Sequence, residues 1–207
     1  MVFKNFIFRS LFSFLFILIY LLIAFINFHF VFYLILLVYL LIFFEIYNHF
    51  KSYKLIPTIY ILVSLFFFLN LDFNQINFIN FNLFILIVVS FDVFSYLCGK
   101  LVGVNKLIKI SPNKTIEGLL GGIAFSYIFT FLFSNYMKLN IDLKLIFFTS
   151  SIIISAFFGD ILESYFKRKN NLKNSSEIIP GHGGLFDRFD SFLFAIIIYS
   201  VFINLKL

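Results

Sequence analysis

Residues 145–162 have the sequence LIFFTSSIIISAFFGDIL, and residues 163–169 continue directly as ESYFKRK. The first stretch has the apolar character and nearly the length of a helix that crosses a bilayer, which takes about 20 residues. The second stretch is rich in charged side chains, which are stable only in polar surroundings. We therefore predict a membrane-spanning helix that continues past the bilayer, and the rest of the fold follows from this element.

The composition of the whole chain agrees with this prediction. Of its 207 residues, 62% are apolar and 13% are charged, whereas about a quarter of the residues of a soluble domain are charged. The high hydrophobicity also excludes an intrinsically disordered chain. Cys98 is the single cysteine, which excludes an intramolecular disulfide and a thiolate metal cluster.

Six further apolar runs accompany the first, and we predict an all-α polytopic membrane protein with about seven transmembrane helices. The expected spans are Ser10 to Asn27, Phe28 to Tyr47, Tyr53 to Leu71, Phe78 to Cys98, Leu119 to Met137, Leu145 to Leu162 and Phe189 to Leu205. The junction between the first two carries no charge or turn signal, so one long helix is an alternative there.

The chain divides into an amino-terminal region, residues 1–77 with about three helices, and a second region, residues 78–207 with about four, which holds most of the charged and glycine-rich segments. Lys4 and Arg9 precede the first apolar run, as in a signal peptide, but no small-residue cleavage site follows it. We therefore expect this first run to remain as a span.

The basic residues predict the orientation in the membrane. With the amino terminus in the cytoplasm, 13 of the 16 Lys and Arg residues lie inside, which is the bias expected of cytoplasmic loops. The exceptions are Lys138, Lys144 and Lys206. We expect a multi-pass protein of the cell inner (cytoplasmic) membrane whose net charge of +6 contacts anionic lipids rather than nucleic acid.

Two of the connections predicted on the cytoplasmic side stand out from the apolar background. Residues 99–118 and 163–188 together hold nine of the 16 basic residues, six of the nine glycines and two of the three prolines. We therefore expect the functional site at this face of the membrane.

An acidic and then basic face follows the span at residues 145–162. Asp160, Glu163, Ser164 and Lys167 are spaced i, i+3, i+4 and i+7, which places them on one side of a helix. A simple i,i+4 ion pair between Glu163 and Lys167 is the alternative, worth roughly 0.3–0.5 kcal/mol. That pair alone would leave Asp160 near hydrocarbon without a partner, which favours a bound ligand at this face.

Residues 180–191, PGHGGLFDRFDS, lead directly into the last span. Asp187, Asp190 and Ser191 fall on the opening turn of that helix, so we expect Asp187 to converge with Asp160 at one depth. Two carboxylates together with substrate phosphates are typical ligands of Mg²⁺. The glycines would let backbone amides approach phosphate oxygens. A helix-terminal charge beside a plain turn is the alternative.

Residues 111–118, SPNKTIEG, predict another helix start, with Ser111 as N-cap and Pro112 at the first helical position. The free amides of such a terminus, together with Lys114, suit a phosphate group. The G-x-x-x-G pair of Gly118 and Gly122 favours close helix packing.

Two acids lie within predicted spans. Asp92 is well inside its span and needs a partner, either a metal or a lysine from the neighbouring loops. Glu45 lies near the cytoplasmic end of its span, where we expect it to reach water.

The motifs resemble the phosphatidate cytidylyltransferase family, also called CDP-diacylglycerol synthases. The likeness covers roughly Asp92 to Ser191, about half of the chain. The positions that match without a gap are Ser164, Lys167, Arg168, Lys173, Pro180, Gly181, His182, Gly183, Gly184, Asp187, Arg188, Asp190 and Ser191. The blocks at 159–164 and 111–118, and Asp92, Tyr96, Gly99 and Gly103, resemble further parts of the family pattern.

This resemblance implies transfer of a cytidylyl group from CTP to phosphatidate with Mg²⁺ as the cofactor, and it makes residues 78–207 the catalytic region. It implies metal binding by Asp160 and Asp187, with Asp92 and Asn174 as further candidate ligands. The catalytic set would be Asp160, Asp187, Lys167, Arg168 and Arg188. The substrate-binding set would be Ser111, Lys114, Ser164, Lys173, Gly181, His182, Gly183, Gly184 and Asp190, with His182 either contacting a phosphate or shaping its loop.

The chain departs from the family pattern in three ways. Asn174 stands where the family has Asp, Ser176 stands where it has Gly, and the chain is shorter than usual members before the matched half. Because of these departures, a catalytically impaired relative is one alternative. A second is a homodimer in which another copy of the chain supplies the missing spans. A membrane transporter of anionic substrates and an enzyme with another lipid phosphate acceptor are the remaining alternatives.

Overall fold

The computed structural model describes residues 18–73, 78–108, 111, 114–176 and 183–205, and within these residues the chain is helical. A helical segment at residues 18–26 precedes six further helices. These are α2 (His29–His49), α3 (Leu55–Leu69), α4 (Phe78–Val102), α5 (Ile116–Met137), α6 (Leu143–Lys169) and α7 (Phe186–Leu205). The predicted all-α fold is confirmed.

The first two predicted spans are separate helices, so the alternative of one long helix is wrong. The helix breaks at Asn27 and Phe28, and α2 starts at His29. The Asn27 side chain accepts a hydrogen bond of 2.9 Å from the backbone N–H of His29. Asn is a residue whose side chain bonds to nearby backbone and so favours a break over a continuous helix. Asn27 is therefore the turn residue between the two helices, and the apolar residues on either side made it hard to recognise in the sequence.

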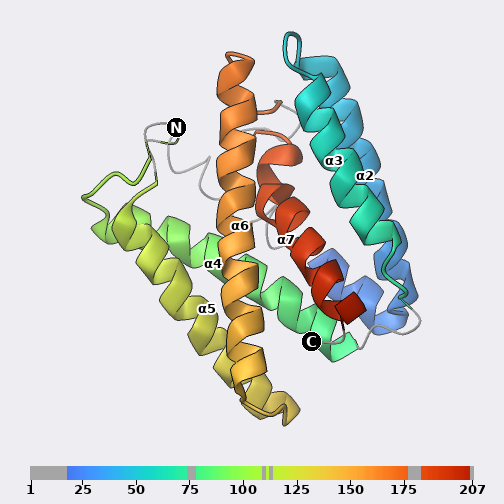
Figure 1. Cartoon of the computed structure of the whole chain (residues 1–207), viewed down its shortest axis with the longest axis vertical. Helices are drawn as coiled ribbons and strands as arrows, with labels where there is room; N and C mark the ends of the chain where they lie inside the picture. Colours follow the sequence, from blue (N-terminus) through green and yellow to red (C-terminus); the bar gives the residue numbers. More distant parts are fainter. Residues whose placement is uncertain (1–17, 74–77, 109–110, 112–113, 177–182, 206–207) are drawn as a thin grey trace.

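Helix α6 runs through the length of the molecule, with α7 beside it and the α2 and α3 pair beyond α7 (Figure 1). Helix α4 crosses behind α6, and α5 packs along α4. One hydrophobic core joins all these helices, with fully buried members that include Ile42, Phe81, Ile152 and Tyr199. The core is continuous across residue 77, and the division into two regions there stays a prediction.

Four helices, α2, α4, α5 and α6, are long and apolar enough to cross a membrane. Helix α3 is apolar but has 15 residues, about 22 Å of helix, which is less than the hydrocarbon thickness of about 30 Å. Large apolar side chains such as Phe25, Tyr136 and Leu143 are exposed. A chain that displays this surface is suited to lipid, and we describe it as a polytopic membrane protein.

Glycines bring α5 against α4, as the G-x-x-x-G pattern predicted. A Cβ atom on Gly122 would collide with the hydroxyl of Ser95, and one on Gly121 would collide with the side chain of Cys98. A Cβ on Gly118 would lie 3.0 Å from the Cα atom of Gly99. The absence of side chains at these positions allows the two backbones to approach, which is how small residues promote helix association in membranes.

The predicted start of α5 is wrong. Helix α5 begins at Ile116 and its N-cap is Thr115, whose Oγ1 accepts a hydrogen bond of 3.1 Å from Gly118 N. Ser111 lies before the helix, where its carbonyl accepts a bond of 3.1 Å from Lys114 N. The segment that precedes the helix pairs back on itself through an antiparallel bridge between Lys106 and Thr115. This pairing uses the backbone groups that an earlier helix start would need; Pro112 lies outside the described residues.

Candidate active site

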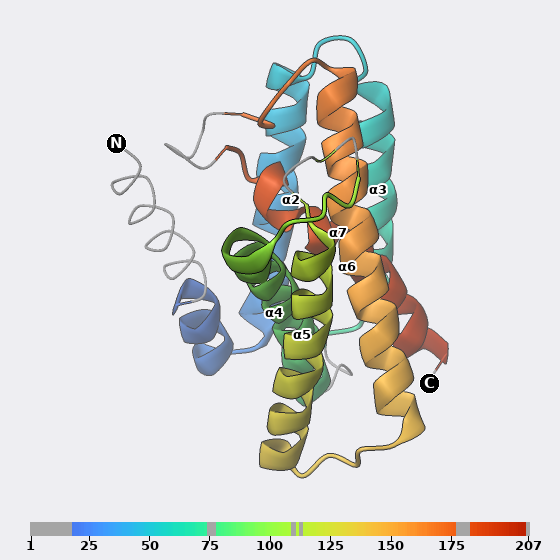
Figure 2. The same cartoon turned by 90° about the vertical axis from the view of Figure 1, so that its left-hand side faces the viewer.

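The site forms where α6 ends and α7 begins, on the side of the molecule away from the α5–α6 connection (Figure 2). The loop before α5 reaches the same region, as the Lys114 contact described below shows. Gly159 makes the close approach of α6 and α7 there, because a Cβ atom at this position would collide with the carbonyl oxygen of Asp190. The two helices therefore bring their charged turns together.

Three carboxylates meet at this crossing. Asp160 and Glu163 of α6 and Asp190 of α7 each offer an oxygen, and these oxygens lie within 4.8 Å of one another. Glu163 is 1% exposed, and its Oε1 accepts no hydrogen bond from any described residue. Buried polar atoms are normally paired, and a cluster of oxygen ligands of this kind suits a hard divalent cation. The donor set therefore fits a metal ion.

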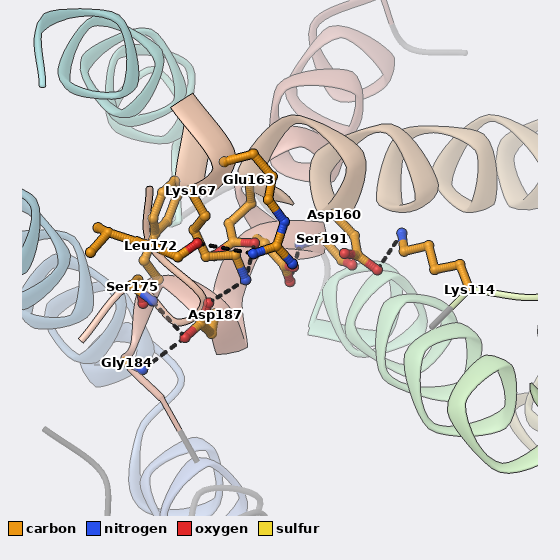
Figure 3. Close-up of polar contacts among 12 residues, drawn as sticks. Lys114, Asp160, Glu163, Lys167, Leu172, Ser175, Gly184, Asp187 and Ser191 are labelled. Carbon is orange, nitrogen blue, oxygen red and sulfur yellow. Dashed lines mark hydrogen bonds and ion pairs between the residues drawn. The ribbon is translucent and has the colours of Figure 1, made fainter. Parts of the chain in front are cut away.

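Lys167 joins the acids of α6 to the start of α7. Its Nζ lies 2.7 Å from Glu163 Oε2 and 2.6 Å from Asp187 Oδ1 (Figure 3). The i,i+4 pair of Glu163 and Lys167, which was the alternative for this helix face, is thus present. It is one part of a larger arrangement, because the same ammonium group also holds an acid from another helix.

Asp187 is fixed on both of its oxygens. While Oδ1 faces Lys167, Oδ2 accepts hydrogen bonds of 3.0 Å from the backbone amides of Ser175 and Gly184. Burial acts to raise the pKa of this carboxyl, but hydrogen bonding with the Glu163 carboxyl, the charge of Lys167 and the Gly184 amide outweigh burial and hold the pKa at about 2. Asp187 precedes the apolar part of α7 and stays ionised at physiological pH. Gly183 adopts a left-handed φ of 84° beside it, which glycine allows.

Asp160 and Asp92 have partners from other elements. Lys114, in the loop before α5, places its Nζ 2.5 Å from Asp160 Oδ2 (Figure 3). Asp92, in the middle of α4, accepts a hydrogen bond of 2.8 Å from Ser191 Oγ. The predicted partner of Asp92 was a metal or a lysine, and the hydrogen-bond partner that the structure shows is this hydroxyl. Four elements thus contribute polar side chains to one region.

The remaining predicted site residues differ in their exposure and contacts. Ser164 is buried on the inner side of α6, whereas Lys173, Asn174 and Arg188 are exposed. Arg168 donates a hydrogen bond of 3.0 Å from Nη1 to the carbonyl of Leu172, at the end of its own helix. Gly181 and His182 lie outside the described residues.

Asp160 and Asp187 do not share the acidic cluster in this structure. The oxygens of Asp187 face Lys167 and two backbone amides, and the group of three carboxylates consists of Asp160, Glu163 and Asp190. Metal binding by Asp160 and Asp187 together stays a prediction. The signal for Glu163 was present in the sequence, because it follows Asp160 by three residues on one helix face. The meeting of Asp190 with these two acids depends on how α7 packs.

Glu45 was expected to reach water, and this expectation is wrong. It is 0% exposed, and its Oε2 accepts hydrogen bonds of 2.8 Å from Leu185 N and 3.2 Å from Phe186 N. These amides belong to the start of α7, 140 residues away in the chain. No local sequence pattern marks such a contact.

A sequence model of the cytidylyltransferase family matches residues 1–206. The phosphatidate cytidylyltransferases of Staphylococcus haemolyticus (strain JCSC1435) and Staphylococcus aureus (strain COL) are each 42% identical to this chain over 119 residues. The enzyme of the same name from Staphylococcus saprophyticus subsp. saprophyticus is 43% identical over the same length. In each case the match covers 56% of this chain and 45% of the relative, so the chain spans about half the length of these proteins.

Proposed function

This chain belongs to the cytidylyltransferase family, and we propose that it transfers the cytidylyl group of CTP to phosphatidate, giving CDP-diacylglycerol and pyrophosphate. The observation that carries the proposal is the convergence of family-motif side chains at the α6–α7 crossing. Three acids with close oxygens and the paired Lys167 and Lys114 lie there. The relatives named phosphatidate cytidylyltransferase support the same reaction.

In the proposed reaction a phosphate oxygen of phosphatidate attacks the α-phosphorus of CTP. A new phosphorus–oxygen bond forms, the bond from the α-phosphorus to the bridging oxygen breaks, and pyrophosphate leaves with that electron pair. The attacking phosphate already carries negative charge, so the reaction needs no strong base. The protein's work is alignment and stabilisation of charge.

We infer that the cation is Mg²⁺ and that Asp160, Glu163 and Asp190 would hold it, with Asp92 next to them through Ser191. When bound, Mg²⁺ neutralises charge on phosphate oxygens and helps to align them. The assignment to Asp160 and Asp187, with Asn174 as a further ligand, requires that Asp187 exchange its contact with Lys167 for the metal. The two assignments differ in the role of Glu163.

The basic side chains of the region would bind the phosphates. Lys114 is 19% exposed at its side chain and lies against Asp160 at the edge of the cluster, where it can meet an anionic ligand next to the acids. Arg168, Lys173 and Arg188 are exposed on and between α6 and α7. Arg suits a phosphate because its guanidinium can donate two parallel hydrogen bonds.

The location of the site agrees with a lipid substrate. The acids lie where the apolar length of α6 gives way to the polar residues 163–169, which is the level of the lipid head groups for a helix that crosses the bilayer. We propose that this face is cytoplasmic, because most Lys and Arg residues lie in the connections on this side. The amino terminus would then be cytoplasmic too, and a homodimer stays a prediction.

The experiment is formation of CDP-diacylglycerol by the purified chain in vesicles that contain phosphatidate, with CTP and Mg²⁺. We expect product from the wild type and none from Asp187→Ala or after chelation. A folded wild type without product would favour the impaired relative, and Asn174→Asp would then restore the acid that the family has. Uptake of an anionic substrate without any product would favour the transporter.

A further inference from the structure

The start of α7 is held by an acid from α2. Glu45 Oε2 accepts the N–H groups of Leu185 and Phe186, at 2.8 and 3.2 Å. The first amides of a helix have no partner within that helix, and a side chain just before the helix usually satisfies one of them. Here the acceptor is a fully buried side chain of a distant helix.

Gly184 provides an independent sign of the same contact. A Cβ atom on Gly184 would collide with Oε1 and Cδ of Glu45. Its φ is not among the positive ones, so a substitution would meet the Glu45 carboxyl and not a strained backbone. The absence of a side chain at Gly184 therefore leaves room for the Glu45 carboxyl, with the Ser175 hydroxyl beside it.

Aromatic packing fixes the two helices around the contact. The rings of Phe50, just after α2, and Phe186, at the first residue of α7, lie 6.1 Å apart between centroids. Phe186 is 0% exposed and Phe50 is 1% exposed. The end of α2 and the first turn of α7 thus form one packed unit.

We propose that Glu45 is a positioning residue for the cytidylyl transfer proposed above, on which this inference rests. By holding the first amides of α7, it sets the place of Asp187 and Asp190 against α6. The link is short: Gly184, beside the anchored amides, donates to Asp187 Oδ2, and Asp190 follows one turn later. The amino-terminal helices would then contribute to catalysis without touching a substrate.

Two substitutions distinguish the effect of the length of the Glu45 side chain from the effect of its charge. Glu45→Gln keeps an oxygen at the same distance from α2, so it can still accept both N–H groups. Glu45→Asp keeps the charge but is one methylene shorter, and α2 cannot move closer because Ile42 and Ile46 are buried in the core around it. We expect the Gln variant to retain activity and the Asp variant to behave like Glu45→Ala.

The full chain in lipid discs is assayed for kcat and for the KM of CTP, together with hydrogen exchange of the peptide that covers residues 183–188. For Glu45→Ala and Glu45→Asp we expect kcat to fall roughly 10- to 100-fold, as for a misplaced catalytic group, with much faster exchange. Glu45→Gln should stay within about threefold of wild type in kcat, since an amide oxygen preserves the hydrogen bonds. Ile35→Ala is the matched control, because Ile35 is a buried residue of the same helix, about three turns before Glu45, and its truncation leaves Ile42 and Ile46 in place.

The proposal is overturned if the Gln variant loses as much activity as the Ala variant, or if Ala and Asp leave kcat and exchange at wild-type values. If Glu45→Ala does not fold, the contrast between Gln and Asp decides. Hydrogen exchange does not depend on turnover. A wild type that forms no CDP-diacylglycerol therefore defeats the proposed function, while the exchange contrast still tests the anchor.

Discussion

The α4–α5 pair and the α6–α7 pair are both brought together by glycines that leave room for the opposing backbone. In the first pair the glycines face the uncharged side chains of Ser95 and Cys98. In the second pair Gly159 faces the carbonyl of Asp190, and Asp160 is its direct neighbour in the chain. The same packing thus makes an uncharged helix contact in one place and a cluster of acids in the other.

The difference lies in the residues that flank the glycine. A small residue at a membrane-helix interface allows close packing whatever its neighbours are. When acids stand beside it on both helices, close packing also forces their charges together, which is unfavourable unless a cation or a base compensates. The α6–α7 crossing is therefore the place where packing and chemistry are coupled.

Loss of an acid at the α6–α7 crossing should have the largest effect on activity. We expect Asp160→Asn and Asp190→Asn each to lower kcat about 100-fold or more, as removal of a group that stabilises charge at an active site does. Asp142→Asn is the control, because Asp142 caps the other end of α6 with a bond of 2.9 Å to Leu145 N. Assays of CDP-diacylglycerol formation measure these effects. Wild-type activity of Asp190→Asn would show that the carboxylate from α7 takes no part in the reaction.

Adding a methyl group to each helix pair tests the comparison directly. Gly159→Ala and Gly121→Ala should each destabilise the protein by about 1–3 kcal/mol through overpacking. We expect only Gly159→Ala to lower activity, by about tenfold, because it moves Asp190 away from α6. Thermal unfolding and turnover are measured for both variants. Equal losses of activity in the two variants would show that the glycines act only through stability.

The charge balance of the α6–α7 crossing can be broken at Lys167. Lys167→Met leaves the buried Glu163 and the partly buried Asp187 without their shared cation, which should cost about 3–5 kcal/mol of unfolding free energy. Adding Glu163→Gln to Lys167→Met should recover part of this loss, since one of the two acids is then neutral. A double-mutant cycle by denaturant unfolding measures the coupling. Simple additivity of the two changes would contradict a coupled pair.

The smallest expected effect is the change in Tm when a metal ion binds. We expect saturating Mg²⁺ to raise the Tm of wild type by about 2–4 °C for each kcal/mol of binding stabilisation, and chelation to reverse it. Glu163→Gln should abolish the shift. If the shift instead survives Glu163→Gln and is lost in Asp187→Asn, the metal belongs to Asp160 and Asp187.

Several features of the fold and site follow from the sequence alone, because they depend on a local period. The apolar runs predicted helices, and the spacing of Asp160, Glu163 and Lys167 placed them on one face of α6. The start of α7 close to Asp187 was also predictable from the motif that leads into the last span. In each case the signal lies within about two helical turns.

Other features depended on which helices meet, and this only the tertiary structure decided. Asp190 joins Asp160 because Gly159 admits α7, and Lys114 reaches Asp160 from a loop some 45 residues earlier. Glu45 binds α7 amides across 140 residues. A sequence pattern shows the periodicity of one helix. It does not show which distant residue an acid on that helix will contact. The α6 face was therefore determined by sequence, and its partners were determined by packing.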